Sequence, residues 1–141
     1  MSEEIIVAVS GGFDPIHIGH VRLMQEAKAL GHKLLVFVNS DEFLIRKKGR
    51  AFMSLADRME IISSFACVDE VHPVIDEDQS VCKTLEKHRP HIFANGGDRF
   101  TDNIPEAIIC KELGIKTIFN VGKGGKVRSS SDLLYKYHNL K

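Results

Sequence analysis

The sequence predicts an α/β protein, in which five parallel strands form one doubly wound sheet within a single domain of residues 1–141. The first observation is that short apolar runs alternate with helix-forming stretches along almost the whole chain. The second is that these runs are rich in β-branched and aromatic residues, as strands buried on both faces of a sheet are. The third is that glycine, serine or proline stands where several of the helix-forming stretches begin or end.

The apolar runs that we expect to be strands are Ile5–Val9, Leu34–Val38, Val71–Ile75, His91–Ala94 and Thr117–Val121. The expected helices are His20–Leu30, Leu55–Ala66, Gln79–His88, Ile104–Leu113 and a last one from about Ser129 to Tyr137. Gly31 and Gly114 end two of these helices, and Ser54 begins another. Because crossovers between parallel strands are right-handed, such a chain forms an open Rossmann-like sheet with helices on both faces. A ligand is expected at the carboxyl ends of the strands, where the strand order reverses.

Charge and hydropathy exclude several classes of partner. Lysine and arginine together number 19, as do aspartate and glutamate, so the formal net charge is zero and the pI is near 7.1. We therefore expect no nucleic-acid partner and no membrane surface, and any phosphate site must be local. The first residues are acidic and the apolar run after them is too short for a signal segment or a membrane span, which predicts a cytoplasmic protein.

The cysteines and most of the histidines do not form metal-ligand patterns. Cys67, Cys82 and Cys110 stand apart in apolar or helical contexts, which favours free thiols over a disulfide framework or a zinc site. Histidines that lack the spacing of metal ligands are expected on the surface, namely His32, His72, His88, His91 and His138.

The most informative segment directly follows the first expected strand and reads GGFDPIHIGH. Gly11 and Gly12 predict a turn with unusual φ angles, whose backbone N–H groups can approach an anion beside the positive end of a helix dipole. His17 and His20 are three residues apart, so that both imidazoles can face one ligand, and Gly19 leaves room for it. The segment predicts a phosphate site with two imidazoles beside it.

This segment resembles the signature of the nucleotidyltransferase superfamily that includes the cytidylyltransferases and small adenylyltransferases. The resemblance extends from Val7 to about Leu134. It implies transfer of a nucleoside monophosphate from a nucleoside triphosphate to a phosphorylated polyol or sugar, with release of pyrophosphate. It also implies Mg²⁺ held mainly by triphosphate oxygens, with no metal ligands expected from the protein, and a homodimer.

A basic segment lies between the second expected strand and the helix that begins at Ser54. Arg46–Arg50 is expected to be a loop on the ligand side of the sheet. In the resembling families a lysine of this loop contacts the triphosphate and the substrate phosphate, and Lys48 matches it best, with Lys47 as its neighbour. Arg58 matches an arginine of the family pattern, or it serves as a structural ion-pair partner.

Two further segments match the family's nucleotide-binding elements. Gly97 and Asp98 belong to a Gly-Gly-Asp turn at the end of the fourth expected strand, which holds the nucleoside in the resembling families. Arg128 precedes three serines that begin the last expected helix, and there the family holds the β- and γ-phosphates.

The residues thus fall into two groups. The expected catalytic residues are His17, His20 and Lys48. The expected nucleotide- and phosphate-binding residues are Gly11, Gly12, Phe13, Asp14, Gly19, Lys47, Gly97, Asp98, Arg128, Ser129, Ser130 and Ser131. Because the attacking phosphate is already ionised near neutral pH, these groups need to orient the reactants and stabilise charge on the α-phosphate and pyrophosphate, and no strong general base is required.

Three alternatives remain beside CMP transfer from CTP, which we favour slightly. The segments around Phe13 and Gly97 are similar to both the CTP- and ATP-using branches, so an adenylyltransferase of a sugar phosphate, like the heptose-phosphate adenylyltransferase domains, is the first. A non-catalytic nucleotide-binding regulatory module is the second. A dinucleotide-binding domain is disfavoured because Pro15 interrupts the glycine spacing that such domains require.

Overall fold

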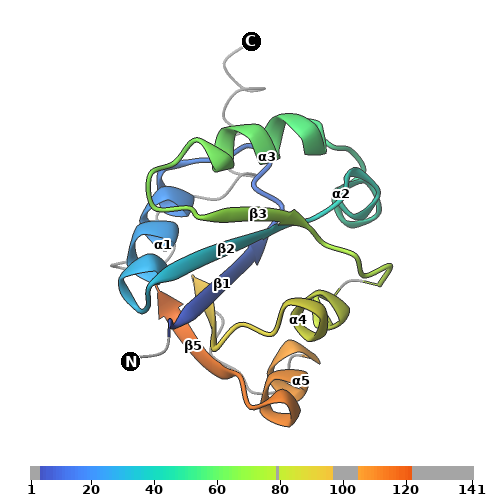
Figure 1. Ribbon diagram of the computed structural model, residues 1–141. Helices are drawn as coiled ribbons and strands as arrows, with labels where there is room; N and C mark the ends of the chain where they lie inside the picture. Colours follow the sequence, from blue (N-terminus) through green and yellow to red (C-terminus); the bar gives the residue numbers. More distant parts are fainter. Residues whose placement is uncertain (1–3, 79, 97–104, 122–141) are drawn as a thin grey trace.

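The computed structural model describes residues 4–78, 80–96 and 105–121, which form a five-stranded sheet (Figure 1). The strands are β1 (Ile6–Gly11), β2 (Lys33–Val38), β3 (Glu70–Pro73), β4 (Ile92–Gly96) and β5 (Lys116–Val121). The helices are α1 (Ile18–Ala29), α2 (Asp41–Lys48), α3 (Leu55–Ser63), α4 (Cys82–His88) and α5 (Pro105–Leu113). All strand pairs are parallel, in the order β3-β2-β1-β4-β5, which confirms the predicted fold class.

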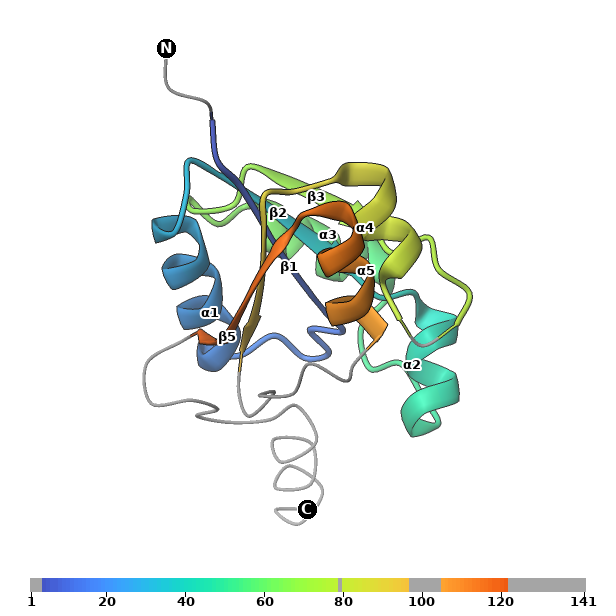
Figure 2. The same cartoon turned by 90° about the horizontal axis from the view of Figure 1, so that it is seen from below.

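Helices cover both faces of this sheet. α1 and α3 pack on one face, whereas α4 and α5 pack on the other (Figures 1 and 2). The chain proceeds from β1 outward to β2 and β3 and then returns to place β4 on the other side of β1. The strand order therefore reverses at the carboxyl end of β1, which is where open α/β sheets bind their ligands.

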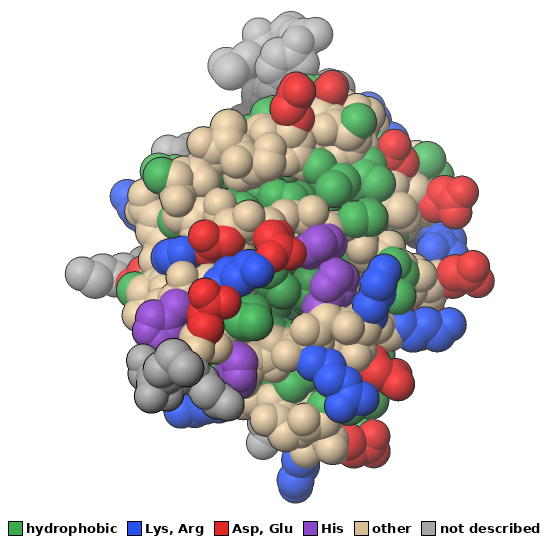
Figure 3. Space-filling view, viewed as in Figure 1, with side chains coloured by type: hydrophobic (Ala, Val, Ile, Leu, Met, Phe, Trp, Pro, Cys, Tyr) green, Lys and Arg blue, Asp and Glu red, His purple; other side chains and the backbone are tan. Residues whose placement is uncertain are grey.

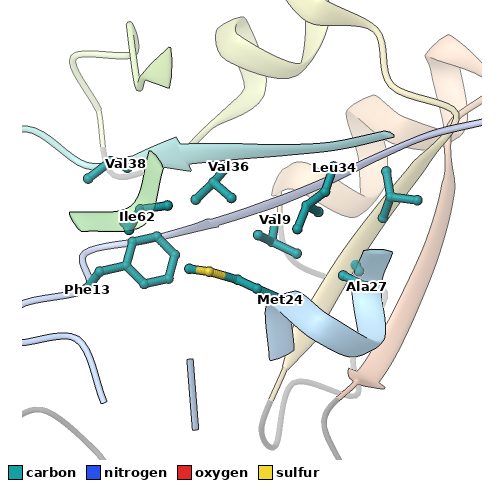
Figure 4. Close-up of a cluster of buried hydrophobic side chains, with 10 residues drawn as sticks. Val9, Phe13, Met24, Ala27, Leu34, Val36, Val38 and Ile62 are labelled. Carbon is teal, nitrogen blue, oxygen red and sulfur yellow. The ribbon is translucent and has the colours of Figure 1, made fainter. Parts of the chain in front are cut away.

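Side-chain alternation along the strands creates one apolar cluster on each face. Val9 and Val36 point toward α1 and α3, where they pack with Met24 and the other residues of Figure 4. Leu35 and Phe93 belong to the opposite cluster, under α4 and α5. Full burial of each such side chain stabilises the fold by about 1.5–3 kcal/mol. Burial on both faces explains why these strands read as nearly continuous apolar runs.

The sequence did not predict α2, and the expectation of a basic loop at Arg46–Arg50 was wrong. The Ser40 hydroxyl caps the start of α2 by accepting the N–H of Phe43, and Gly49 ends the helix with φ 86°. Lys48 is the last residue of this helix. The basic residues therefore belong largely to the last turn of a short helix.

α4 also differs from its predicted bounds, because it begins at Cys82 instead of Gln79. The Asp76 carboxylate accepts the N–H groups of Lys83 and Thr84 and the hydroxyl of Thr84, and so binds the first turn from outside the helix. The expected helix from Ser129 to Tyr137 lies outside the described residues. Within the described ranges, no helix is both long and apolar enough to cross a membrane.

Candidate active site

The turn after β1 owes its glycines to crowding and not to unusual φ angles, so that expectation was wrong. The residue with positive φ is Phe13, at 52°, and its side chain is buried. A Cβ atom on Gly11 would lie 3.0 Å from the Phe13 ring, and one on Gly12 would lie 2.8 Å from Leu44 Cδ2. The glycines thus let the chain pass between the Phe13 ring and α2.

Asp14 holds this turn against the segment that leads into α3. The residue is only 1% exposed, and its two carboxylate oxygens accept the backbone N–H groups of Phe52 and Met53 at 2.6 and 2.5 Å. The chain from Phe52 to α3 is therefore fixed relative to β1. These bonds assign Asp14 a bracing role in the site.

His17 and His20 together cap the start of α1. His17 Nδ1 accepts the N–H of Gly19 at 3.1 Å, and His20 Nδ1 accepts the N–H of His17, also at 3.1 Å. The two rings stack with centroids 3.8 Å apart, and the Phe13 and His20 rings form a T-shaped pair with centroids 4.9 Å apart. The two imidazoles therefore lie side by side, while their predicted contact with one ligand stays a prediction.

This capping arrangement fixes the tautomer of both neutral rings. A neutral imidazole has one acceptor and one donor nitrogen, and here both Nδ1 atoms act as acceptors. The proton of each ring therefore resides on Nε2. Each neutral ring is an N–H donor through Nε2, at the end of a helix that already favours anions.

Arg58 ties together the segments that surround the carboxyl end of β1. It is 1% exposed, and its guanidinium donates to the carbonyl oxygens of Gly12 at 2.8 Å and Asn39 at 2.7 Å. It also donates to Met53 O and pairs with Asp41 Oδ1 at 2.7 Å. Of the two roles left open by the sequence, the structural one matches these contacts, because Arg58 binds protein groups from three segments of the chain.

The expected lysines lie at the end of α2. The ammonium of Lys47 stands 5.6 Å from the centroid of the Phe43 ring, a cation–π distance. The side chain of Lys48 lies outside the described part. The remaining expected nucleotide-binding residues also lie outside it, namely Gly97, Asp98, Arg128, Ser129, Ser130 and Ser131.

Two of the other histidines are not simple surface residues, contrary to expectation. His72 and His88 are half-buried and stack with centroids 4.3 Å apart, and Phe37 lies next to the His88 ring at 5.1 Å. On the face of the molecule shown in Figure 3, histidine side chains lie near the middle, next to acidic and basic side chains. His72 Nε2 lies 2.7 Å from Glu70 Oε1. In the described ranges, no three His, Cys, Asp or Glu side chains are placed to hold a metal ion together.

The chain was compared with protein-family models. The model described as cytidylyltransferase-like matches residues 8–132. The chain belongs to the cytidylyltransferase-like family. This is the family that the sequence resemblance predicted.

Curated relatives support this membership. The bifunctional protein HldE of Streptomyces coelicolor is 42% identical over 131 residues, which are 92% of this chain and 27% of that protein. HldE of Hydrogenovibrio crunogenus is 41% identical over 108 residues, 74% of this chain and 22% of that protein. The chain thus spans about a quarter of the length of these relatives.

Solved structures agree with the fold. A lipopolysaccharide core biosynthesis protein from Thermoplasma volcanium has a TM-score of 0.72 and 25% identity, over 85% of this chain and 98% of that one. A bifunctional NMN adenylyltransferase/ADP ribose pyrophosphatase from Francisella tularensis, complexed with AMP, has a TM-score of 0.67 and 17% identity, over 97% of this chain and 42% of that one. The second likeness concerns the fold alone.

Proposed function

We propose that this chain transfers the adenylyl group of ATP to a sugar phosphate and releases pyrophosphate. The chemistry rests on one observation, the stacked pair of His17 and His20, whose Nδ1 atoms accept backbone N–H groups. The choice of ATP rests on the relatives. The sequence resembles the heptose-phosphate adenylyltransferase domains, and HldE proteins are about 40% identical to it. They favour the adenylyltransferase alternative over CMP transfer.

The start of α1 is suited to a triphosphate. α1 has no acidic residue in its first turn, whereas α2 has Asp41 and Glu42 there and α3 has Asp57. Acidic side chains near a helix N-terminus compete with a bound anion for the positive end of the dipole. We therefore place the phosphates at the start of α1 and not at the start of α2 or α3.

Two imidazole donors then stabilise the transition state. An oxygen of the sugar phosphate attacks the α-phosphorus in line, and the bond to the pyrophosphate oxygen breaks. Nε2–H of His17 and of His20 donates to oxygens of the α- and β-phosphates, on which negative charge accumulates. Donors held in place before the reaction need no reorganisation during it, and each contributes about 2.7–4 kcal/mol by analogy with oxyanion-hole groups.

The other contacts of this proposal come from the family resemblance. Lys48 bridges the attacking phosphate and the α-phosphate, with Lys47 as its neighbour. Gly97 and Asp98 hold the nucleoside. The pyrophosphate is held by Arg128, Ser129, Ser130 and Ser131. The protein acts as a homodimer, which light scattering of the purified chain would test.

Mg²⁺ completes the proposal as an ion that neutralises part of the triphosphate charge. Both carboxylate oxygens of Asp14 already accept backbone N–H groups, so this carboxylate suits a contact through water better than a direct bond. Such a site fits Mg²⁺, which retains several waters and binds substrate phosphates through few protein groups.

The test is pyrophosphate release from each of the four nucleoside triphosphates with a panel of phosphorylated sugars and polyols. We expect the fastest release with ATP and a sugar phosphate. The fastest release with CTP and a polyol phosphate would instead support CMP transfer. Tight nucleotide binding without pyrophosphate release from any pair would support the regulatory module.

A matched control is available for the histidines. His32 Nδ1 accepts the N–H of Ile5 at 2.9 Å, near the amino end of β1 and thus at the opposite edge of the sheet from His17. His32→Ala removes a ring with the same kind of hydrogen bond. It should leave pyrophosphate release unchanged.

A further inference from the structure

Two buried amides near the site each have a polar atom without a hydrogen-bond partner. Asn39 and Asn95 are 7% and 6% exposed, and the atoms concerned are Asn39 Oδ1 and Asn95 Nδ2. Most buried polar side-chain atoms in proteins form hydrogen bonds. An atom without a partner loses its hydrogen bonds to water on burial and gains none in the protein, which is unfavourable. Two such atoms at the carboxyl ends of β2 and β4, the strands on either side of β1, indicate a ligand.

Strand alternation directs both amides to the same face of the sheet. Asn39 follows Leu35 and Phe37 at intervals of two, and its N–H donates to Gly11 O at 3.0 Å, so the ladder continues one residue beyond β2. Asn95 follows Phe93 at the same interval. The irregularity in the β4–β5 ladder lies in β5, which has three residues between successive pairs where β4 has two. The alternation of side chains along β4 is therefore undisturbed. Both amides therefore lie on the face covered by α4 and α5.

The amides flank β1. β2 and β4 pair with β1 on its two sides, so the two amides stand two strand spacings apart, roughly 10 Å across the sheet. Ser10 belongs to β1 between them and follows Ala8 on the same face. A ligand that lies across the end of β1 with polar groups along its length can reach both amides.

The two amides and the start of α1 belong to opposite faces of the sheet. His17 and His20 begin α1, which packs on the opposite face of the sheet through Met24 and Ala27. If the triphosphate lies at the start of α1, a ligand on the α4 and α5 face is the second reactant. β1 lies between β2 and β4, so its carboxyl end lies next to both positions.

We infer that Asn39 and Asn95 recognise hydroxyl groups of the acceptor sugar phosphate, an inference that rests on the proposed function. A hydroxyl both donates and accepts, so it can donate to the Asn39 carbonyl oxygen and accept from the Asn95 N–H. Phosphate oxygens only accept and could not satisfy Asn39. An acceptor that lacks these hydroxyls leaves the amides unpaired, and sites of this kind reject such analogues strongly.

The test uses the nearly isosteric variants Asn39→Leu and Asn95→Leu. Thr84→Val is the matched control, because Thr84 is also buried under this face but both donates to Asp76 and accepts from Ile75. Four quantities are measured: the melting temperature of the ligand-free protein, kcat, and the KM values for ATP and for the most active sugar phosphate of the panel. Glucose 1-phosphate and 2-deoxyglucose 1-phosphate serve as binding probes in titration calorimetry.

In each asparagine variant we expect the KM for the sugar phosphate to rise at least tenfold and the KM for ATP to stay within twofold. The melting temperature should stay the same or increase, because Asn39 Oδ1 and Asn95 Nδ2 are buried without partners in the absence of ligand. Thr84→Val should show the opposite, a lower melting temperature with unchanged KM values. A loss of melting temperature without a change in KM would overturn the inference in favour of a structural role. A rise in the KM for ATP alone would assign the amides to the ribose and overturn it too.

Failure of the proposed function gives a different result. The wild-type chain would then release no pyrophosphate with any pair, and calorimetry with glucose 1-phosphate would test the amides by themselves. Binding by the wild type that weakens at least tenfold in Asn39→Leu would support the amide site. Equal binding by both proteins, or none by the wild type, would overturn it.

Discussion

The His17 and His20 rings stack 3.8 Å apart, and each ring accepts a backbone N–H through Nδ1. The helix cap and the proposed catalytic pair are therefore the same two side chains. A substitution that removes a ring removes both a cap and a donor, so the two effects have to be separated by the choice of the new residue.

His17→Asn should separate them at the first position. Asparagine is among the best N-cap residues, so the start of α1 and the melting temperature should be nearly preserved. The Nε2–H donor is lost, and kcat for pyrophosphate release should fall by about 10²-fold or more. Steady-state kinetics and thermal melting measure the two effects. Wild-type turnover in this variant would remove His17 from the mechanism.

His20→Gln makes the same separation at the third residue of the helix. Glutamine there can accept the N–H of the N-cap residue and so retain the capping box. We expect a similar loss of kcat with little change in stability. His32→Ala is the control, and a loss of kcat in this control would show that any histidine substitution impairs the enzyme.

Lys48→Ala should lower kcat/KM much more than Lys47→Ala. Only one ammonium can lie between two converging phosphates, and Lys47 stands over the Phe43 ring at 5.6 Å. Initial rates at varied ATP and acceptor concentrations measure the difference. Equal small losses in the two variants would indicate that the basic end of α2 acts only as a diffuse positive charge.

Arg58→Met should destabilise the protein by about 3 kcal/mol or more, because the carbonyl oxygens of Gly12, Asn39 and Met53 lose their donor. Asp41 is 44% exposed at its side chain, so its lost ion pair adds little. Urea denaturation measures the change, and Arg22→Met, on the exposed side of α1, should change stability little. An unfolding midpoint for Arg58→Met equal to that of wild type would contradict the bracing role.

The stability of the protein should fall as the pH decreases below 6.5. Burial, together with the neighbouring His72 and Lys87, lowers the pKa of His88 below 6.5, while Glu70 opposes this shift. Since the folded pKa is the lower one, the unfolded chain binds more protons between the two values. The contribution of His88 to the free energy of unfolding is therefore fully present above pH 6.5. It decreases as the pH falls toward the folded pKa.

His88→Gln should remove this decrease, which melting temperatures between pH 8 and 5 would detect. A second decrease at lower pH should remain in the variant. The hydrogen bonds from Lys33 and His72 lower the pKa of Glu70 below 4.5, so its stabilising contribution is lost as the pH falls through that lowered pKa. An unchanged pH profile in His88→Gln would show that His88 does not titrate in this range.

The sequence by itself determined the five strands, four of the helices and the position of the histidine pair. The strand bounds can be predicted from the sequence to within about two residues, because parallel strands buried on both faces are continuous apolar runs. α2 could also have been predicted, since Ser40 and Gly49 are typical residues at the start and end of a helix. It was not predicted because its sequence is polar and its basic run was interpreted as a loop.

Only the tertiary structure decided which groups meet around the end of β1. Arg58 binds Gly12 and Asn39, which are 46 and 19 residues away in the chain, because β1 and β2 are neighbours and α3 packs over their ends. The Phe13 ring likewise occupies space that a side chain on Gly11 would fill, which is apparent only in the folded turn. The residue pattern of a segment indicates its own secondary structure and which of its faces is buried. Partners and tight packing depend on residues that are distant in the chain, so they become visible only when the sheet is assembled.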